Sequence, residues 1–387
     1  MNPGLPCRLA SLILLALSCG VLAAAEPFRF PERTYKQAEL KYVHGLPVMI
    51  LQGTPEQIGE QQAALVADVV RPLMAYPKKV LDEHGYGAAW PLAVGMSRRL
   101  IDNGPERFRR ELEAAVSKSG LDGDALYVGN AMLELRRLGG CSSIIVLPER
   151  SATGQLLFGR NMDFDPMGIL HQYSLVAVYR PEGRRAFVAV GFPGMIGAAS
   201  GMNDAGLALA TNDVYSSSDG SSMFNPEGAP LGFTFRRILE ECATVAEAET
   251  LLRESKRTTW MNLAVCDPQS AAVFEITPDS VAVRKPDEGL LPCTNHFCVP
   301  GLTTEKQCWR FDRLVKAQDF DKLGHKEIAG LLDTVNQGKF TLQTMIFEPA
   351  ARRLHLSIGE GPSSSRPLAP LELRPLLEAK RTAESGS

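Results

Sequence analysis

A cysteine inside the segment RLGGCSSIIV, residues 137–146, stands where its side chain could do chemistry. Cys141 follows two glycines and precedes two serines and an apolar run, which suits the first residue of a strand. A thiol at that place, behind glycines that free the backbone, could be a nucleophile or mark a processing site. The alternative is a half-buried structural cysteine at the end of a strand.

A cut directly before Cys141 would give its thiol a base. The new α-amino group has an ordinary pKa near ~8, so it can accept a proton at neutral pH. The thiol needs such a neighbour, because the thiolate is the reactive species. Gly140 suits the other side of the cut, since a residue without a side chain can present its carbonyl to the thiol in a strained geometry.

Charged and amide side chains follow where strands are expected to end. Arg160 and Asp163, in FGRNMDFDP, would stabilise the thiolate and accept hydrogen bonds from the new ammonium. The alternative for this pair is an ordinary ion pair in a turn. Asn212 ends GMNDAGLALATND, and CTNHF carries Asn295 beside His296. Asparagine amides are good oxyanion donors because they are neutral and are fixed by their other hydrogen bonds, although each could also be a turn residue.

Helices before Cys141 and strands after it must position these residues. Thr54, Pro55 and Gln57 form a capping-box pattern that starts a helix. After an irregular lead-in over 26–45, the chain up to residue 140 is mainly helical, with further helices over 88–118 and 121–138. Strands are expected at 142–148, 156–160, 173–179, 186–191, 196–201, 206–211, 260–266, 271–276, 280–285, 342–348 and 352–357. Helix pairs are expected at 231–243 and 245–255, and at 304–318 and 325–335. This alternation indicates stacked sheets covered by helices, a layered α+β fold, with a linker over 361–368 and a disordered tail after about 378.

The composition excludes several classes of protein. The chain has 387 residues, of which 45% are hydrophobic and 22% charged, as in a soluble globular protein of one large domain or two ordinary ones. A formal charge of −3 without a long basic block argues against a nucleic-acid partner. The sequence contains no G-x-S-x-G, H-E-x-x-H, P-loop or C-x-x-C motif, and its six histidines are scattered. It therefore predicts neither a cofactor nor a metal site.

The N-terminus is typical of a secretory signal peptide over residues 1–25. Arg8 precedes a short apolar stretch, and three alanines end at Ala25 in a small-residue cleavage site. We expect cleavage after Ala25 and a secreted or periplasmic protein without a stable membrane span. Lipid attachment at Cys19 is disfavoured, because Ala16 stands where a leucine would precede it.

Six cysteines remain after such a cleavage. An exported protein can keep disulfides, so one bridge among the last three, which lie close together, is plausible. The pairing itself cannot be read from the sequence. The cysteines besides Cys141 are Cys242, Cys266, Cys293, Cys298 and Cys308.

Together, these segments resemble the N-terminal nucleophile (Ntn) hydrolases. The resemblance rests on Cys141, G-R-N-x-D at 159–163, G-x-N-x-x-G-L at 201–207, T-N-H-F at 294–297 and a later arginine, Arg310. Within that group, the order of the motifs is similar to the family of acyl-coenzyme A:6-aminopenicillanic acid acyltransferase. Its relatives are acid ceramidase, N-acylethanolamine acid amidase and the choloylglycine hydrolases. The resemblance extends over about residues 45–358.

The resemblance implies a four-layer αββα fold and self-cleavage between Gly140 and Cys141. The resulting chains, 26–140 and 141–387, would stay associated. Cys141 would attack a linear amide of an N-acylated small molecule, with its own amine as base. Carried over to this sequence, Arg160 and Asp163 flank the nucleophile, Asn212 and Asn295 match the oxyanion and amine-orienting positions, and Arg310 matches the family's arginine. Asn212 is the loosest of these matches, because Asp213 stands beside it.

Three alternatives stay open at this point. The acyl group could pass to an amine, which would make the protein an acyltransferase. A papain-like protease would pair Cys141 with His296, 155 positions later, although the C-G-S-C-W surround is missing and an asparagine directly precedes the histidine. An exported binding protein could use the same scaffold without catalysis. Isolation of two chains, one of them with a free Cys141 amine, would favour the hydrolase over the papain-like protease and the binding protein.

Overall fold

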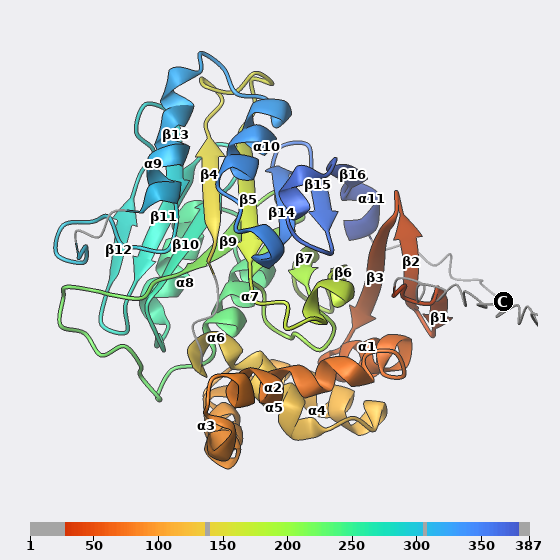
Figure 1. Ribbon diagram of the computed structural model, residues 1–387. Coiled ribbons are helices and arrows are strands. Elements are labelled where there is room, and N and C mark those ends of the chain that lie inside the picture. Colours follow the sequence, from red (N-terminus) through yellow and green to blue (C-terminus); the bar gives the residue numbers. More distant parts are fainter. Residues whose placement is uncertain (1–27, 136–139, 305–307, 379–387) are drawn as a thin grey trace, which may run out of the picture.

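The computed structural model of the protein describes residues 28–135, 140–304 and 308–378. Two sheets lie face to face in the middle of the molecule, and helices cover both outer faces (Figure 1). The expected signal peptide and the tail after residue 378 lie outside the described residues, as do parts of the helices expected at 121–138 and 304–318.

The larger sheet has ten strands, in the order β1-β2-β3-β6-β7-β8-β9-β10-β11-β12. β3 and β6 pair in parallel, while the other neighbours in this sheet pair antiparallel. The strands are β1 (Arg33–Tyr35), β2 (Ala38–Val43), β3 (Leu46–Gly53), β6 (Leu175–Pro181), β7 (Phe187–Gly191), β8 (Ser200–Asn203), β9 (Ala208–Asp213), β10 (Met261–Cys266), β11 (Ala271–Ile276) and β12 (Val281–Arg284).

The smaller sheet has six strands, in the order β13-β4-β5-β14-β15-β16, and all of its neighbours pair antiparallel. Its central strands are buried along their whole length, because both faces of the sheet are covered. The strands are β4 (Ser142–Val146), β5 (Leu157–Asp163), β13 (Leu290–Cys293), β14 (Thr341–Glu348), β15 (Arg353–Ile358) and β16 (Ala369–Glu372).

The helices fall into a group before Cys141 and a group after it. The first group is α1 (Pro55–Val66), α2 (Tyr76–Glu83), α3 (Trp90–Asp102), α4 (Glu106–Ser119), α5 (Gly123–Asn130) and α6 (Met132–Leu135). The second is α7 (Leu231–Glu241), α8 (Val245–Glu254), α9 (Trp309–Val315), α10 (His325–Thr334) and α11 (Arg374–Leu377). Thr54 caps α1 as predicted, and Gln57 completes the capping box.

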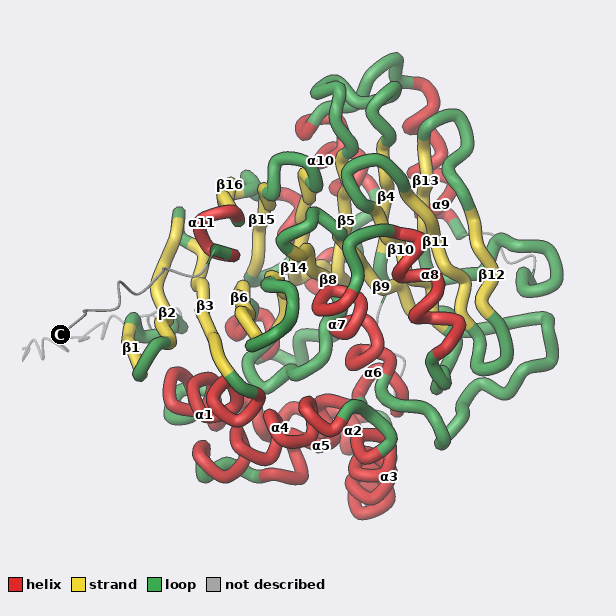
Figure 2. The backbone as a smooth tube through the Cα atoms, turned by 180° about the vertical axis from the view of Figure 1, so that it is seen from behind, coloured by secondary structure: helices red, strands yellow, loops and turns green. Residues whose placement is uncertain are grey.

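Three apolar cores hold the layers together. One lies between α1, α7 and α8 and the outer face of the ten-stranded sheet, which Figure 2 shows from behind. A second core fills the space between the two sheets. The third joins the outer face of the six-stranded sheet to α9 and α10. This succession of helix, sheet, sheet and helix confirms the predicted four-layer αββα fold.

The predicted elements differ from the structure in several places, and β13 was not among the predicted strands. The lead-in over 26–45 is not irregular, because β1 and β2 lie in it. The helix expected over 88–118 is two helices, α3 and α4, since Gly104 and Pro105 interrupt it. The linker expected over 361–368 contains a short 3-10 turn and leads into β16. α2 was not predicted at all.

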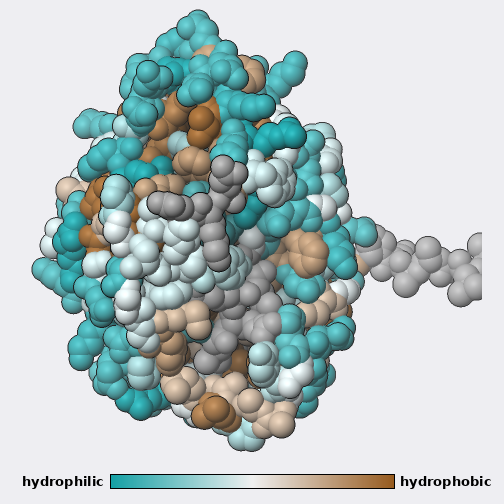
Figure 3. Space-filling model, turned by 60° about the vertical axis from the view of Figure 1, so that its left-hand side comes forward, coloured by the Kyte–Doolittle hydropathy of each residue, from teal (hydrophilic) through white to brown (hydrophobic). Residues whose placement is uncertain are grey.

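The described surface carries few large apolar side chains. The most exposed of them are scattered over different elements, and the face shown in Figure 3 is mostly hydrophilic with smaller hydrophobic patches. Among the described residues, no helix is long and apolar enough to span a bilayer. The six cysteines of the described chain are all free thiols, so the bridge expected among Cys293, Cys298 and Cys308 is not formed in this structure.

Candidate active site

Antiparallel pairing brings distant parts of the sequence to the start of β4. Cys141 directly precedes β4, and the neighbouring strands β5 and β13 both end beside that point. Asp163 is the last residue of β5, and Asn295 follows β13 by two residues. Thr341, the first residue of β14, is the register partner of Asp163. The smaller sheet therefore gathers polar side chains around the peptide bond between Gly140 and Cys141.

The backbone and side chain of Cys141 are each held by a different residue. Its N–H donates to Asn295 Oδ1 at 2.7 Å, and its carbonyl accepts from Arg310 Nη1 at 2.6 Å. Arg310 also donates to Asn295 Oδ1, at 2.8 Å. The Cys141 Sγ lies 3.6 Å from Arg160 Nη2. Burial raises the pKa of the Cys141 thiol, and the guanidinium of Arg160 acts against that rise.

The carboxylate of Asp163 is linked to Gly140 through Gln337. Its Oδ1 accepts from Thr341 Oγ1 at 2.6 Å and its Oδ2 from Gln337 Nε2 at 2.8 Å, while its main-chain carbonyl accepts the N–H of Gly140 at 3.0 Å. Burial raises the pKa of Asp163 to about 6, although these hydrogen bonds and nearby arginines lower it.

Gln337 was missed by sequence reasoning. Its Nε2 donates to the carbonyl of Gly140 at 2.8 Å as well as to Asp163. The residue lies between α10 and β14, and its own N–H donates to Thr341 Oγ1 at 2.7 Å. Nothing in the surrounding sequence, VNQGKF, marks this glutamine, because its position depends on the register of β14 against β5.

Asn212 does not join this group in the way that the sequence predicts. Its Oδ1 accepts from Ser143 Oγ at 2.9 Å, and its buried Nδ2 has no hydrogen-bond partner among the residues that the structure describes. Its neighbours on β9, Thr211 and Asp213, line the cavity beside Cys141 instead. The alternation of a strand explains the difference, since residues 211 and 213 face the opposite way from residue 212.

His296 is engaged by residues other than Cys141. Its Nδ1 lies 2.9 Å from Thr294 Oγ1 and its Nε2 lies 3.5 Å from Cys298 Sγ. Hydrogen bonds to Cys298 and Cys308 raise the pKa of His296 to about 9. The imidazole is therefore not placed as a base for the Cys141 thiol, which a papain-like mechanism would need.

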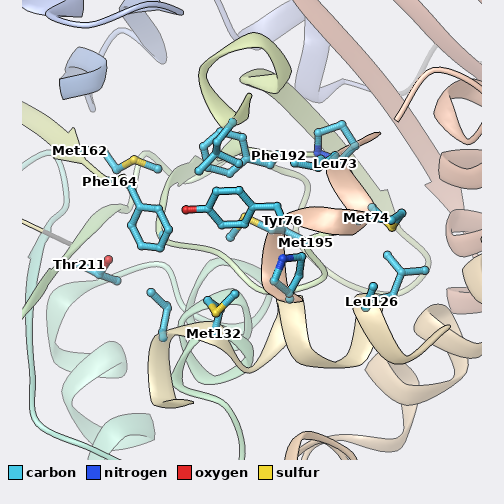
Figure 4. Close-up of a pocket in the computed structure, with 18 of the residues that line it drawn as sticks. Leu73, Met74, Tyr76, Leu126, Met132, Met162, Phe164, Phe192, Met195 and Thr211 are labelled. Carbon is cyan, nitrogen blue, oxygen red and sulfur yellow. The ribbon is translucent and has the colours of Figure 1, made fainter. Parts of the chain in front are cut away.

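An apolar cavity opens beside Cys141 and Arg160. It encloses about 890 Å³, its open mouth included, and it is lined by helices that precede Cys141 and by strands and loops that follow it. In Figure 4, Met162, Phe164 and Thr211 lie at one side and Met74 and Leu126 at the opposite side, so the cavity is elongated. Phe164, Phe192 and Met195 line the cavity, whereas Met167 and Ile169 pack against the core on the outer face of the ten-stranded sheet.

A second polar cluster lies away from this site. His325, Glu348 and His355 each offer one ligand atom, and the three atoms lie within 4.8 Å of one another, as a metal site would need. Glu348 Oε1 already lies 2.6 Å from His355 Nε2, 3.1 Å from His325 Nε2 and 3.6 Å from Arg353 Nη1. Glu348 and Thr341 are at opposite ends of β14, which separates the cluster from Cys141.

Known proteins share sequence and structural similarity with this chain. A protein of Archaeoglobus fulgidus that carries no functional name is 23% identical over 367 residues, covering 78% of this chain and 60% of its own. Rat acid ceramidase is 26% identical over 178 residues, covering 41% of this chain and 44% of the enzyme. The chain thus spans less than two thirds of these curated relatives. Conjugated bile acid hydrolase of Clostridium perfringens, a solved structure, has a TM-score of 0.46 at 16% identity, covering 62% of this chain and 95% of that one.

Residues 150–361 match the family of acyl-coenzyme A:6-aminopenicillanic acid acyl-transferase. The matched segment runs from the turn after β4 to the end of β15 and includes Arg160, Asp163, Asn295, Arg310 and Gln337. It covers more than half of the 387 residues, which confirms the resemblance drawn from the motifs. This chain belongs to the acyl-coenzyme A:6-aminopenicillanic acid acyl-transferase family, within the Ntn hydrolases.

Proposed function

We propose that this protein is a cysteine Ntn hydrolase that cuts itself between Gly140 and Cys141 and then hydrolyses a linear amide of an N-acylated small molecule. Membership of an acyl-transferase family supports acyl-group chemistry. The observation that carries the proposal is the convergence on one peptide bond: Asn295 holds its N–H, Gln337 holds its carbonyl, and Arg160 lies beside the thiol that would attack it.

After the cut, the residues around Cys141 would serve turnover. The new α-amine would accept the thiol proton, since its ordinary pKa is near ~8. Asn295 Oδ1, which accepts the Cys141 N–H in the uncut chain, would keep that amine oriented. The guanidinium of Arg160 would stabilise the thiolate, and the nearby Asp163 carboxylate would favour the charged ammonium. The thiolate would attack the scissile carbonyl carbon of the substrate, the C–N bond would break, and the amine would leave with the proton held by the α-amine of Cys141. Water would then hydrolyse the resulting thioester, which releases the carboxylic acid and restores the thiol.

The cavity supports an apolar acyl group as the part of the substrate that is bound. Its lining is almost entirely apolar, with methionines that can adapt to a flexible chain. Its contributions from α2, α5 and α6 come from one side of the proposed cut, and those from β5 and the segment 192–195 from the other. Both pieces of the chain would therefore be needed for binding.

Contacts across the proposed cut would keep the two pieces together. Arg236 of α7 donates to both oxygens of Glu111 of α4, at 2.8 and 2.7 Å, and all three groups of the triad with Glu240 are buried. β3 pairs with β6 along six register positions. The signal-peptide pattern of residues 1–25 supports an exported setting for the enzyme.

The covalent state of the purified protein and its activity on amides test the proposal. Intact mass and N-terminal sequencing should find two associated chains, one of which begins with a free Cys141 amine. Cys141→Ala should stay as one chain, and a processed Cys141→Ala protein would show that an outside protease makes the cut. A panel of N-acyl amides with peptides as controls should then show turnover of the amides, and adding an amine acceptor would reveal acyl transfer. Preference for peptides would overturn the proposed reaction.

A further inference from the structure

The side-chain amide of Gln337 touches the carbonyl that self-cleavage must polarise. We propose that Gln337 is an oxyanion donor for the maturation of this protein and contacts no reacting atom in later turnover. The inference rests on the self-cleavage proposed above. It assigns the two reactions of one thiol to partly different residues.

The geometry around Gln337 is that of a donor fixed in place. Its Nε2 carries two hydrogens and has two acceptors, the Gly140 carbonyl and Asp163 Oδ2, each at 2.8 Å. Its backbone N–H is held by Thr341 Oγ1, which also donates to Asp163. A donor held from both sides needs little rearrangement when charge develops on the carbonyl oxygen, and this preorganisation makes oxyanion stabilisation effective.

The chemical step places that charge on the Gly140 oxygen. The Cys141 sulfur bonds to the Gly140 carbonyl carbon, and the C=O π electrons move to the oxygen that Gln337 contacts. When the carbonyl re-forms, the C–N bond to Cys141 breaks, and the nitrogen leaves as an amine that takes up the proton of the thiol. The product is a thioester between Gly140 and the Cys141 sulfur. Water then cleaves the thioester, which releases the Gly140 carboxyl and restores the thiol.

Turnover would use a different side of the thiol. The apolar cavity is lined by Cys141 and Arg160 together with Thr211 and Asp213, and Gln337 does not line it. A substrate whose acyl group fills this cavity brings its carbonyl to the sulfur from the cavity side. Gln337 would then keep Asp163 as its acceptor, after the Gly140 carbonyl is no longer joined to Cys141.

The space beside the Gly140 Cα is occupied by the side-chain amide of Gln337. A Cβ built on Gly140 would lie 2.0 Å from Gln337 Nε2, so Gly140→Ala must push this amide off the carbonyl. The amide is the end of a flexible side chain, and moving it is possible without moving the backbone. The effect of Gly140→Ala on maturation should therefore depend on whether Gln337 is present.

The rate of self-cleavage after cell-free synthesis of the full chain, followed by gel electrophoresis, tests the proposal. Gln337→Ala should slow the cut on the order of 10²-fold, as expected for loss of one oxyanion donor. Gln337→Glu keeps the shape but removes the donor, and it should be at least as slow. Gln343→Ala is the matched control, because Gln343 is buried on β14 but donates to Ser174 instead. Thermal melts of the same substitutions on a Cys141→Ala chain establish that each folds.

Two further measurements separate maturation from turnover. Molecules of Gln337→Ala that have been cut should hydrolyse an N-acyl amide with a kcat reduced far less than the cutting rate, because Gln337 would act in turnover only through its hydrogen bond to Asp163. Gly140→Ala should slow the cut in the wild type but add little on a Gln337→Ala chain. A wild-type cutting rate in Gln337→Ala, a kcat reduced in step with the cutting rate, or additive effects with Gly140→Ala would each overturn the inference. A wild-type chain that is never cut at residue 141 would instead overturn the proposed function.

Discussion

Replacing the buried carboxyl of Asp163 should stabilise this protein above neutral pH. Burial raises the pKa of Asp163 from 3.8 to about 6, so folding favours its protonated form. At pH 8 the folded chain must keep an ionised carboxylate in a buried place, where its side chain is 1% exposed. Asparagine has the same size without the charge. Its carbonyl can accept from Gln337 and its amide can donate to Thr341 Oγ1, because a hydroxyl both donates and accepts.

The magnitude follows from the two pKa values. Between pH 3.8 and 6 the folded chain binds more protons at Asp163 than the unfolded chain does, so the free energy of unfolding falls as the pH rises. A difference of about 2 pKa units corresponds to about 3 kcal/mol, of which about 2 kcal/mol is lost between pH 4.5 and pH 8. Asp163→Asn lacks this loss. The variant should therefore gain about 2 kcal/mol relative to the wild-type aspartate between those pH values.

Urea unfolding of uncut chains measures this difference. Both chains carry Cys141→Ala, so that neither is cut and each unfolds as one molecule, and linear extrapolation gives the free energy of unfolding. The comparison at pH 4.5 also captures any packing cost of the amide, because that cost does not depend on pH. The quantity compared is the free energy of unfolding of the Asp163→Asn chain minus that of the chain with Asp163. If this difference does not increase between pH 4.5 and pH 8, the argument that the pKa of Asp163 is raised in the folded chain is refuted.

Three other predictions address the nucleophile, the cavity and the contact across the cut. His296→Gln should keep most of the kcat/KM on an N-acyl amide, because His296 contacts Thr294 and Cys298 and not Cys141. Asn295→Ala should lower kcat/KM on the order of 10²-fold, because Asn295 holds the Cys141 nitrogen. The opposite order of the two losses would favour a papain-like mechanism. Leu126 lies at the end of the cavity away from Thr211. Leu126→Trp should lower kcat/KM for long acyl groups by about 10-fold or more and leave that for short ones unchanged, because each CH₂ kept out of the cavity forfeits about 0.8 kcal/mol. Equal losses at every acyl length would contradict this. Glu111→Gln leaves the buried Arg236 with Glu240 as its remaining carboxylate partner and should lower the free energy of unfolding in urea titrations by about 3 kcal/mol. An unchanged unfolding midpoint would show that the ion pair between Arg236 and Glu111 contributes little.

The residues of the site differ in how far the sequence can predict them. Arg160 and Asp163 stand at the end of a strand that the sequence predicts, whereas Asn295 is found through the T-N-H-F segment of the family resemblance. The structure brings all three to Cys141. Asn212 lies on β9, where its side chain contacts Ser143 of β4, and its role in the site stays a prediction. Gln337 could not be found, because it lies 197 residues from Gly140 and no local pattern marks it.

The fold shows the same division. Capping at Thr54 and the strand–helix alternation after Cys141 are local signals, and they predicted the layers. β2 was missed, although Ala38 and Leu40 alternate with charged residues in the way expected of a half-buried strand. No local signal tells that β3, from before the cysteine, pairs with β6, from after it. Such long-range pairings depend on the packing of the whole chain.

The pairing of β3 with β6 means that, in a chain cut before Cys141, folding would have to precede the cut. An uncut chain closes this part of the sheet within one molecule, at a cost in loop entropy that grows only slowly with length. Once cut, the same pairing would join two separate chains, and any event that parts them would have to be repaired by a bimolecular encounter at whatever concentration the surroundings allow. We therefore expect the uncut Cys141→Ala chain to recover its structure after cooling from thermal unfolding, while the mature enzyme does not. The lifetime of the mature form would then be set by its rate of unfolding, because the two separate chains would not refold.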